Sequence, residues 1–465
     1  MSQSTMTKPG VVSRKIPPVR GGHFLLGSMP DIQRGPLDFF MSTARQYGDF
    51  VRFRFFLWDA YLVSDPASIK HVLQENNRNY NKQHVDYQML KPLVGEGLLT
   101  SDGSEWLSQR RLIQPAFHKQ RIQGFATVMT TAAEEMLDRW QRRVDPTQPL
   151  DITSEMMRIT LSIAGKTLFS QDIRAEAGTV SKAFTILSED ISTRLRSPFA
   201  IPLSIPTPRN RRFHAAKQML DEVVDEIILS RRQELASGST AHSNDLLTML
   251  LTARDEDTGE GMDDALVRDE VSTLLLAGHE TTANTLSWTW YLLSENPAIR
   301  QRLQRELKDV LGGRMPTMDD LPDLSYTRKV IQEAMRLYPP AWIVSRKAVQ
   351  EDEIGGYHIP ANAVIEMCTY VVHRHPKYWE NPDIFDPERF DPERSAARPA
   401  FAYFPFGGGP RLCIGRDFAM IEAQLLLAAV ASRFSLELKP GHPVEPEPYV
   451  TLRPRYGLPM YLSRI

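Results

Sequence analysis

The sequence predicts a mainly α-helical fold with a minor β region. Between about residues 105 and 335, apolar side chains recur three and four positions apart, as in DEVVDEIILSRRQEL (221–235) and AIRQRLQRELKDVL (298–311). This spacing places apolar side chains on one face of a helix, so helices should dominate that stretch. Two shorter regions, 50–64 and 345–372, are strand-like instead, with partly alternating apolar and aromatic residues.

Turn and breaker residues divide these elements. Residues 50–64 should form a hairpin, and Gly355-Gly356 should form the turn within the second strand-like region. Four prolines between residues 194 and 213 prevent a continuous helix there. The last helix should cover about 414–433, and short strands should follow it.

The domain organisation is expected to be simple. No internal repeat or low-complexity linker divides the chain, so we expect one domain over residues 26–465. Residues 1–25 should be a flexible lead that ends near the turn-biased pair Pro17-Pro18. This lead has no apolar core of the kind that a signal peptide or membrane anchor requires. We therefore expect a cytoplasmic protein without a membrane anchor, and a monomer.

Composition and charge exclude one class of partner. The 465 residues are 42% hydrophobic and 24% charged, which is ordinary for a globular protein. The net charge of −2 gives no basic excess with which to bind nucleic acid. Cys368 and Cys413 are the two cysteines, too few for a disulfide framework.

The stretch FPFGGGPRLCIGRDFAMIEAQ (404–424) places Cys413 after three glycines and next to a predicted helix. Glycines permit positive φ angles and close approach to a planar group. The N-terminal end of a helix and the nearby Arg411 should lower the pKa of the thiol. Cys413 is therefore either a thiolate that acts as a ligand or a nucleophile, or an inert cysteine in a turn.

A second candidate lies on the predicted helix that contains TLLLAGHETTANTLSWTW (273–290). Taken alone, its threonines would bond back to carbonyls one turn earlier. However, Ala277 and Gly278 share a face with Thr281, because they precede it by four and three residues. Small residues beside a hydroxyl leave room for a small molecule. A zinc-protease interpretation of His279 fails because position 283 is Ala.

Phe406, Gly409, Arg411, Cys413 and Gly415 match F-x-x-G-x-R-x-C-x-G, and the chain thereby resembles soluble bacterial-type members of the cytochrome P-450 (haem-thiolate monooxygenase) family. The resemblance implies a fold that wraps haem b, with Cys413 as the axial ligand of the iron. It further implies that Phe406 packs beside the sulfur and that Arg411 contacts a haem propionate. Gly409 and Gly415 would let the loop lie against the porphyrin.

The resemblance extends to other motifs. AGHETT (277–282) is similar to the oxygen-activation motif, in which Ala277 and Gly278 form a groove, Glu280 supplies protons and Thr281 donates a hydrogen bond. Glu333 and Arg336 match E-x-x-R, with Arg389 as the third member of a structural network. Other residues match propionate partners, namely Trp106, Arg110 and Arg346.

The resemblance implies a monooxygenase that inserts one oxygen atom from O2 into a hydrophobic substrate by hydroxylation or epoxidation. Fatty acids and terpenoid or steroid-like molecules are comparable guesses. A peroxide-driven haem-thiolate peroxygenase and a non-oxygenating isomerase are the alternatives. Electrons would come from a ferredoxin or flavodoxin with its NAD(P)H reductase, docking near Arg411, Arg416 and Lys377.

Family position also suggests side chains that line a substrate pocket: Tyr87, Leu274, Ala277, Trp342, Ile343, Val344 and Leu452. Most are apolar, which favours a hydrophobic ligand oriented by shape. A fatty acid would in addition need a cation or hydroxyl at the pocket mouth, and the candidates are Arg194, Arg196 and Tyr87.

Overall fold

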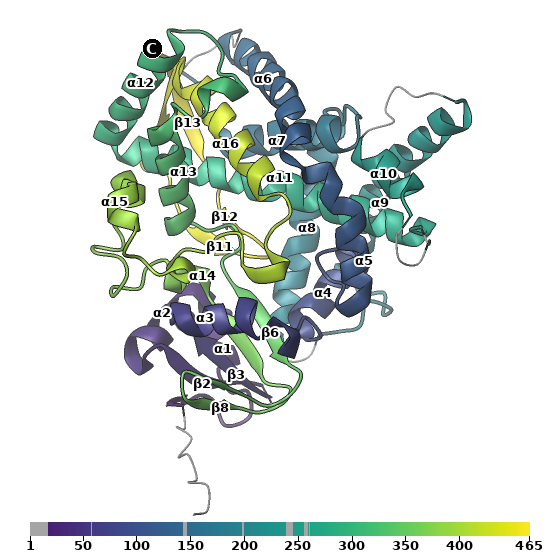
Figure 1. Ribbon diagram of the computed structural model, residues 1–465, viewed down its shortest axis with the longest axis vertical. Helices are drawn as coiled ribbons and strands as arrows, with labels where there is room; N and C mark the ends of the chain where they lie inside the picture. The colour runs from purple at the N-terminus through teal and green to yellow at the C-terminus, as the bar shows by residue number, and fades with distance from the viewer. Residues whose placement is uncertain are drawn as a thin grey trace, which may run out of the picture.

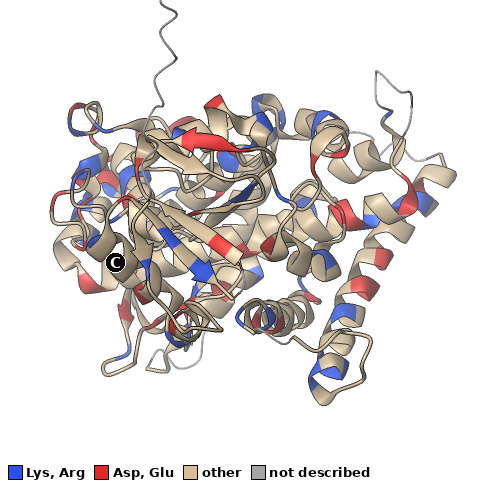
Figure 2. Ribbon diagram, turned by 90° about the horizontal axis from the view of Figure 1, so that it is seen from below, with Lys and Arg blue, Asp and Glu red and all other residues tan. Residues whose placement is uncertain are grey.

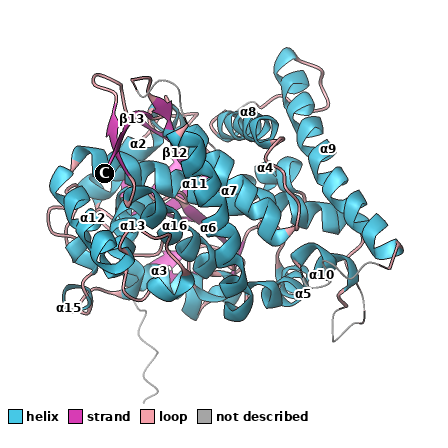
Figure 3. Cartoon of the chain, turned by 90° about the horizontal axis from the view of Figure 1, so that it is seen from above, coloured by secondary structure: helices cyan, strands magenta, loops and turns pink. Residues whose placement is uncertain are grey.

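A computed structural model describes residues 17–56, 58–142, 147–197, 200–238, 245–254, 259 and 261–465. Helices make up most of these residues, several small sheets and the connecting turns and loops make up the rest, and the predicted fold class is confirmed. The sheet that contains β2 and β3 forms the lower part of Figure 1, and most of the helices lie above it. Helices also dominate the view from above (Figure 3).

The helices in the described part of the chain are α1 Met29–Arg34, α2 Pro36–Tyr47, α3 Pro66–Lys70, α4 Val85–Val94, α5 Gly103–Ile113, α6 Lys119–Gln141, α7 Ile152–Leu168, α8 Ala177–Leu195, α9 Pro208–Ala236, α10 Leu246–Thr252, α11 Asp264–Glu295, α12 Pro297–Leu311, α13 Ser325–Leu337, α14 Thr369–Val372, α15 Pro392–Ser395 and α16 Arg416–Ala431. The strands are β1 Val19–Arg20, β2 Phe50–Phe55, β3 Trp58–Val63, β4 Tyr80–Asn81, β5 Leu150–Asp151, β6 Val344–Ala348, β7 Asp352–Ile354, β8 Tyr357–Ile359, β9 Val364–Met367, β10 Phe434–Leu438, β11 Pro446–Pro448, β12 Leu452–Pro454 and β13 Pro459–Arg464.

The helix α11 organises the helical part. It begins where the Asp263 carboxylate accepts a hydrogen bond from the Leu266 amide, 2.8 Å away. Its 32 residues span about 48 Å, and most are buried because α7, α13 and α16 pack around it. Apolar residues up to Leu276 belong to one core cluster, and those from Ala283 onward belong to another. The stretch 277–282 between the two clusters is where the apolar core is interrupted.

The largest sheet has the strand order β1-β2-β3-β9-β6-β4. The predicted hairpin is its β2–β3 pair, with Phe50 opposite Val63. The second strand-like region forms β6 to β9, and Gly355 and Gly356 make the tight turn with φ of 58° and 85°. The last residues of that region, 369–372, form the short helix α14 instead of a strand.

Other expectations need small corrections. Within the expected lead, Val19–Arg20 pair with β2, so the folded chain begins before residue 26, while residues 1–16 lie outside the described part. The last helix covers Arg416–Ala431, because the cysteine loop continues to Gly415. The proline-rich break is confirmed, since α8 ends at Leu195 and α9 begins at Pro208 with Thr207 as its cap.

Surface charge is mixed, as the composition predicts. Figure 2 shows Lys and Arg interspersed with Asp and Glu over the elements in view. Among the described helices, none combines the length and apolar character needed to cross a membrane.

Candidate functional site

The cysteine loop is shaped by close contacts with its neighbours. Gly409 has φ of 65°, and a Cβ at this position would overlap the Leu73 carbonyl oxygen in the helical turn His71–Glu75. A Cβ at Gly408 would overlap the Phe401 ring. The close approach of neighbouring chain segments is therefore enough to require glycine at both positions. The loop closes with a 3.1 Å hydrogen bond from the Cys413 amide to the Phe406 carbonyl.

The Cys413 side chain is exposed, and nearby protein atoms partly desolvate its sulfur. Desolvation raises the pKa of the thiol, and the Gly415 amide, Arg110 and Arg416 partly oppose the rise. The expected lowering of this pKa is therefore not seen in the protein alone. Arg110 from α5 is the main cation that acts on the sulfur, rather than the sequence neighbour Arg411, because the fold turns Arg411 toward Asp102.

Arg411 makes three contacts with the segment 101–106. Its guanidinium forms an ion pair with Asp102, donates a 2.9 Å hydrogen bond to the Ser101 carbonyl and lies 4.0 Å from the centre of the Trp106 ring. Burial lowers the pKa of Arg411 to about 10, although Asp102 opposes the shift. Arg110, one turn after Trp106, donates to the Leu412 carbonyl at 3.2 Å. The structure thus brings together Trp106, Arg110 and the cysteine loop.

Lys82 joins this cluster, although it belongs to none of the sequence motifs. Its Nζ donates to the Leu99 carbonyl at 2.7 Å, and the side chain is buried. Desolvation lowers its pKa well below the usual value, repulsion from Arg346 and Arg411 lowers it further, and Asp102 opposes both. Arg346 is also buried, and its guanidinium donates to the Tyr87 hydroxyl at 3.2 Å. A lone lysine in a turn has no sequence signal that could have identified it.

The interrupted stretch of α11 exposes a short face. Ala277 is exposed and Thr281 is half-buried, although the helix is buried on both sides of them. The Thr281 hydroxyl donates to the Ala277 carbonyl at 2.8 Å. Gly278 turns toward α7, where a Cβ would lie 3.6 Å from Ala164 and Leu168. Of the expected groove, Ala277 and Thr281 lie together, while Gly278 allows α7 to approach closely.

The Glu280 carboxyl points toward the segment that connects β11 and β12. Its Oε1 accepts a 2.9 Å hydrogen bond from the Thr451 hydroxyl, which in turn accepts one of 3.0 Å from the Asn284 amide. The Oε2 atom is buried without a partner among the described residues. Desolvation raises the pKa of this carboxyl, while Thr451 and Arg453 oppose the rise. Burial therefore favours a protonated Glu280.

Glu333, Arg336 and Arg389 meet in one buried network. Arg336 forms a bidentate pair with Glu333 at 2.6 and 2.8 Å, and Arg389 Nε lies 3.3 Å from Glu333 Oε1. Arg336 also donates to the carbonyls of His373, Pro382 and Ile384. The network thus holds the segment 373–389 against α13.

His373 links that network to the cysteine loop. Its Nε2 accepts a 3.0 Å hydrogen bond from the Phe404 amide, and its ring stacks on Tyr403. Burial and Arg336 keep its pKa well below the usual value, so the neutral ring remains available as an acceptor. The sequence alone gave it no role beyond that of a loop histidine.

The proposed pocket residues fall into separate environments. Ile343 and Val344 are half-buried, whereas Leu274 belongs to the core cluster of α8 and α9. Trp342 and Leu452 are buried together in the core near Phe40. Tyr87 belongs to the cation cluster through Arg346 and Lys82.

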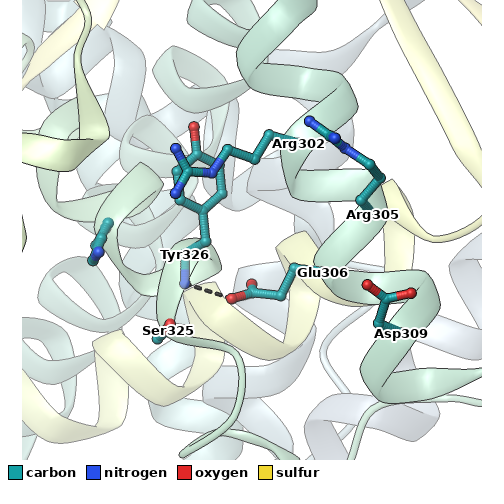
Figure 4. A pocket seen from close by; sticks show the side chains of 7 residues that line it. Arg302, Arg305, Glu306, Asp309, Ser325 and Tyr326 are labelled. Atoms are coloured by element: carbon teal, nitrogen blue, oxygen red, sulfur yellow. Dashed lines mark hydrogen bonds between the residues drawn. The ribbon is translucent and has the colours of Figure 1, made fainter.

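Two surface hollows occur among the described residues, and Cys413 lines neither of them. One, of about 370 Å³ between α12 and α13, is lined by Arg302, Glu306 and Tyr326 among others (Figure 4). Glu306 accepts from the Tyr326 amide at 2.6 Å, and Arg302 pairs with Glu388 at 2.6 Å. These charges are already used to cap α13 and to join it to the segment beside it, so we assign the hollow no ligand.

The residues around Cys413 fit a planar anion. Lys82 and Arg346 are buried cations, Arg411 is a partly buried one, and Asp102 is the carboxylate that acts on both Lys82 and Arg411. Cations in such a setting require further negative charge, because an uncompensated buried charge is costly. Two propionates would supply it, and the exposed Cys413 side chain would be free to ligate the iron. An α-rich fold whose residues would hold haem in this way is that of a haem-thiolate protein.

Comparison with known proteins supports the same class of protein. The sequence model of the cytochrome P450 family matches residues 17–458, and the chain belongs to this family. It is a P450 monooxygenase, an oxidoreductase that binds haem b. Similar proteins include cyclooctatin synthase of Streptomyces melanosporofaciens, 37% identical over 93% of this chain and 92% of the relative. Cyclooctat-9-en-7-ol 5-monooxygenase of the same organism is 38% identical over 90% and 88%. Pentalenene oxygenase of Streptomyces avermitilis is 34% identical over 97% and 96%.

The glycines of the cysteine loop give a matched pair of variants. Gly409→Ala should abolish haem incorporation, because the new Cβ meets the Leu73 carbonyl in a backbone that also requires positive φ. Gly407→Ala has a similar φ of 70° but open space around the Cβ, so only strain of about 1 kcal/mol is expected. Haem content and the thiolate Soret spectrum show how much haem each of the two variants incorporates. Equal haem loss in the two variants would contradict this account of the loop.

Lys82→Met tests the cation cluster. Without haem, the variant should be as stable as the parent or more stable, because a buried and repelled cation is removed. With haem bound, transfer of haem to apomyoglobin should become about tenfold faster, equivalent to 1.4 kcal/mol. Lys91→Met, which removes a partly exposed lysine paired with Glu96, is the control and should change neither property. Unchanged haem transfer from the Lys82 variant would overturn the assignment.

Proposed function

We propose that the protein oxygenates a terpenoid, with Cys413 as the haem ligand and Thr281 and Glu280 as the proton-handling pair. The observation that carries the substrate class is the lack of a free cation among the side chains proposed for a fatty acid. Relatives named for cyclooctat-9-en-7-ol and pentalenene, both terpenoids, support the same class.

Each fatty-acid candidate is already engaged within the protein. Arg194 pairs with Asp190 and donates to the Ile201 carbonyl at 2.6 Å, which fastens the segment between α8 and α9. Arg196 donates to the Pro448 carbonyl. The Tyr87 hydroxyl is held by Arg346. A neutral hydrophobic substrate needs none of these groups, and Ile343, Val344 and Ala277 offer it apolar contacts.

The chain's own residues would act as follows. Lys82, Arg110, Arg346 and Arg411 hold the propionates, assisted by Trp106, and Phe406 and Gly415 shape the loop around the sulfur. When bound, thiolate-ligated haem supplies the activation of O2. Thr281 holds a hydroxyl proton at the accessible face of α11, next to Ala277. Glu280 holds a proton in a buried site, and Thr451 fixes its carboxyl. The network of Glu333, Arg336 and Arg389 keeps the loop in place.

Variants of Thr281 can separate its role in proton handling from any effect on folding. Thr281→Ala should keep haem and substrate binding but lower product per NADPH at least tenfold, as expected when a positioned proton donor is lost. Thr281→Ser should restore most of the product. Thr289→Ala is the control, because its hydroxyl makes the same backbone bond, 2.7 Å to the Thr285 carbonyl, in a buried position.

The assay uses the haem-loaded protein with pentalenene, and separately with palmitic acid, together with ferredoxin, its reductase, NADPH and O2. We expect oxygenated pentalenene by mass spectrometry and a shift of the Soret band to shorter wavelength. Oxygenation of palmitic acid alone would overturn the terpenoid class. Product with peroxide but none with O2 and reductant would favour a peroxygenase, and isomerised substrate without oxygen would favour an isomerase.

Electrons must reach the haem from a separate donor, for which a ferredoxin or flavodoxin with its NAD(P)H reductase remains our proposal. The docking site shifts slightly from the sequence-based expectation. Arg411 is mostly buried by Asp102, and Arg416 pairs with Asp417 at 2.7 Å. Lys377, by contrast, is exposed beside a hollow of about 400 Å³ that Phe401 also lines. Phe401 packs on Gly408 of the cysteine loop, so a donor docked there would lie close to the haem.

Charge reversal tests this surface. Lys377→Glu should lower the second-order rate of haem reduction several-fold at low salt and weaken its salt dependence, because complementary charge mainly affects association. Lys439→Glu, at an exposed lysine that follows β10, is the control. A stopped-flow reduction rate that is the same in both variants would remove Lys377 from the docking site. Cytoplasmic location and a monomeric state remain predictions.

A further inference from the structure

One hydroxyl group lies between two carboxyl groups from different parts of the fold. The Ser345 Oγ of β6 is 2.8 Å from Oδ2 of Asp86 on α4 and 2.6 Å from Oε2 of Glu366 on β9. Ser345 and Glu366 are opposite each other in the β6–β9 pair. Both are buried, and Asp86 is half-buried. The contact therefore joins α4 to the main sheet.

The contact has too few donor hydrogens for its two short hydrogen bonds unless it holds an additional proton. A hydroxyl carries one hydrogen, and an ionised carboxylate only accepts. Ser345 can thus donate to one of the two carboxylates, and the other oxygen would face it without a hydrogen at less than 3 Å. Both distances are normal for O–H···O hydrogen bonds, so one carboxyl group must be protonated.

Glu366 is the carboxyl that burial selects for the proton. Desolvation raises its pKa to about 8, the nearby charge of Asp86 raises it further, and Ser345 opposes the shift. The chain then runs from the Glu366 O–H to Ser345 Oγ, and from the Ser345 O–H to Asp86 Oδ2. Ionisation of Glu366 removes a donor and leaves two anions around one hydroxyl.

The other charged groups around this contact do not neutralise the negative charge that Glu366 would carry when ionised. On α4's side, His84 Nδ1 lies 3.6 Å from Asp86, and His84 is also influenced by Arg346 and Lys347. Arg346 donates to the Ser345 carbonyl instead of a carboxylate. Directly after β9, the Cys368 thiol has a pKa raised to about 12 and stays neutral, and β3 presents Leu62 opposite Glu366. Within the described chain, Glu366 has no lysine or arginine as an ion-pair partner.

The far end of α4 is anchored differently. Asp269 of α11 accepts from the Glu96 amide at 2.8 Å, and Glu270 accepts from the Leu98 amide at 3.1 Å. Burial raises the pKa of Asp269, and it raises that of Glu270 to about 8. A carboxyl oxygen accepts these amide protons in either charge state, so this anchor survives ionisation. The α4 segment is therefore fixed to α11 at one end and depends on a proton at the other.

We propose that Asp86, Ser345 and Glu366 form a proton-dependent latch that closes α4 against the sheet and releases it when Glu366 ionises. The α4 segment carries Tyr87, which is bonded to Arg346 in the cation cluster, so release would loosen one side of the haem site. This consequence rests on the proposed function of that cluster, whereas the latch itself does not.

The sign of the pH effect follows from linkage. Glu366 binds its proton more tightly in the closed form than when exposed, where its pKa is near 4.5. Opening therefore releases a proton between about pH 4.5 and pH 8, and the opening equilibrium should rise about tenfold per pH unit in that window. Above pH 8 both forms are ionised, so the equilibrium should become constant.

Hydrogen exchange of the haem-loaded protein between pH 6 and pH 9 measures this opening in peptides that cover residues 85–94. Glu366→Gln is the reference, because its amide still donates to Ser345 but cannot ionise. The exchange rate of the wild type is divided by that of this variant, which removes the intrinsic pH dependence of exchange. This ratio should rise toward pH 8 and then become constant. A ratio independent of pH would overturn the latch.

Three further variants give independent readings. Ser345→Ala should leave α4 open at every pH. Asp86→Asn should lower the pH at which the curve levels, because the charge that helps to hold the Glu366 proton is lost. Glu270→Gln should leave the pH dependence intact, and its loss there would place the titrating group on α11 and overturn the assignment. The exchange readout needs no turnover, so failure of the proposed oxygenation and failure of the latch are distinguishable.

Discussion

Lys82 and Arg346 are held in the protein interior with the partly buried Arg411 beside them, and Asp102 acts on both Lys82 and Arg411. Keeping cations there without more negative charge costs several kcal/mol per ion. The arrangement becomes favourable when an anion enters, which supports our proposal that the cluster is a cradle for the haem propionates. Much of the surrounding structure fixes that cradle: α5 supplies Trp106 and Arg110, β6 supplies Arg346, and the cysteine loop supplies Arg411.

The proximal side is held by a different set of buried polar contacts. Glu333 and Arg336 on α13 bind the segment that carries His373, and His373 accepts from the Phe404 amide at the start of the cysteine loop. The distal side is set by α11, whose apolar core is interrupted at 277–282. Buried networks thus support the loop around the sulfur, whereas the latch that we propose makes only one end of the α4 segment depend on a shared proton.

Sequence motifs predicted the elements and the family, and they proposed Cys413 as the ligand, but they did not predict the partners of each side chain. The spacing in 404–424 identified Cys413, yet Arg110 from another helix, and not Arg411, is the main cation near the sulfur. Gly278 was expected in the groove but faces α7. Trp342 and Leu452, which family position suggests for the pocket, belong to the buried cluster that contains Phe40, and their pocket role stays a prediction. Lys82 gave no signal, since its importance comes from burial beside residues more than 260 positions away.

The sequence by itself determined the helical class, the β2–β3 hairpin, the Gly355-Gly356 turn and the haem-thiolate family. These follow from periodicity, glycine conformation and a short spaced motif, which act over neighbouring residues. Only the tertiary structure decided which charges are buried, which carboxyl groups keep a proton and which glycines are required by close approach. Desolvation and hydrogen bonding depend on atoms brought together from distant segments, as when β9, β6 and α4 place Glu366, Ser345 and Asp86 in one line.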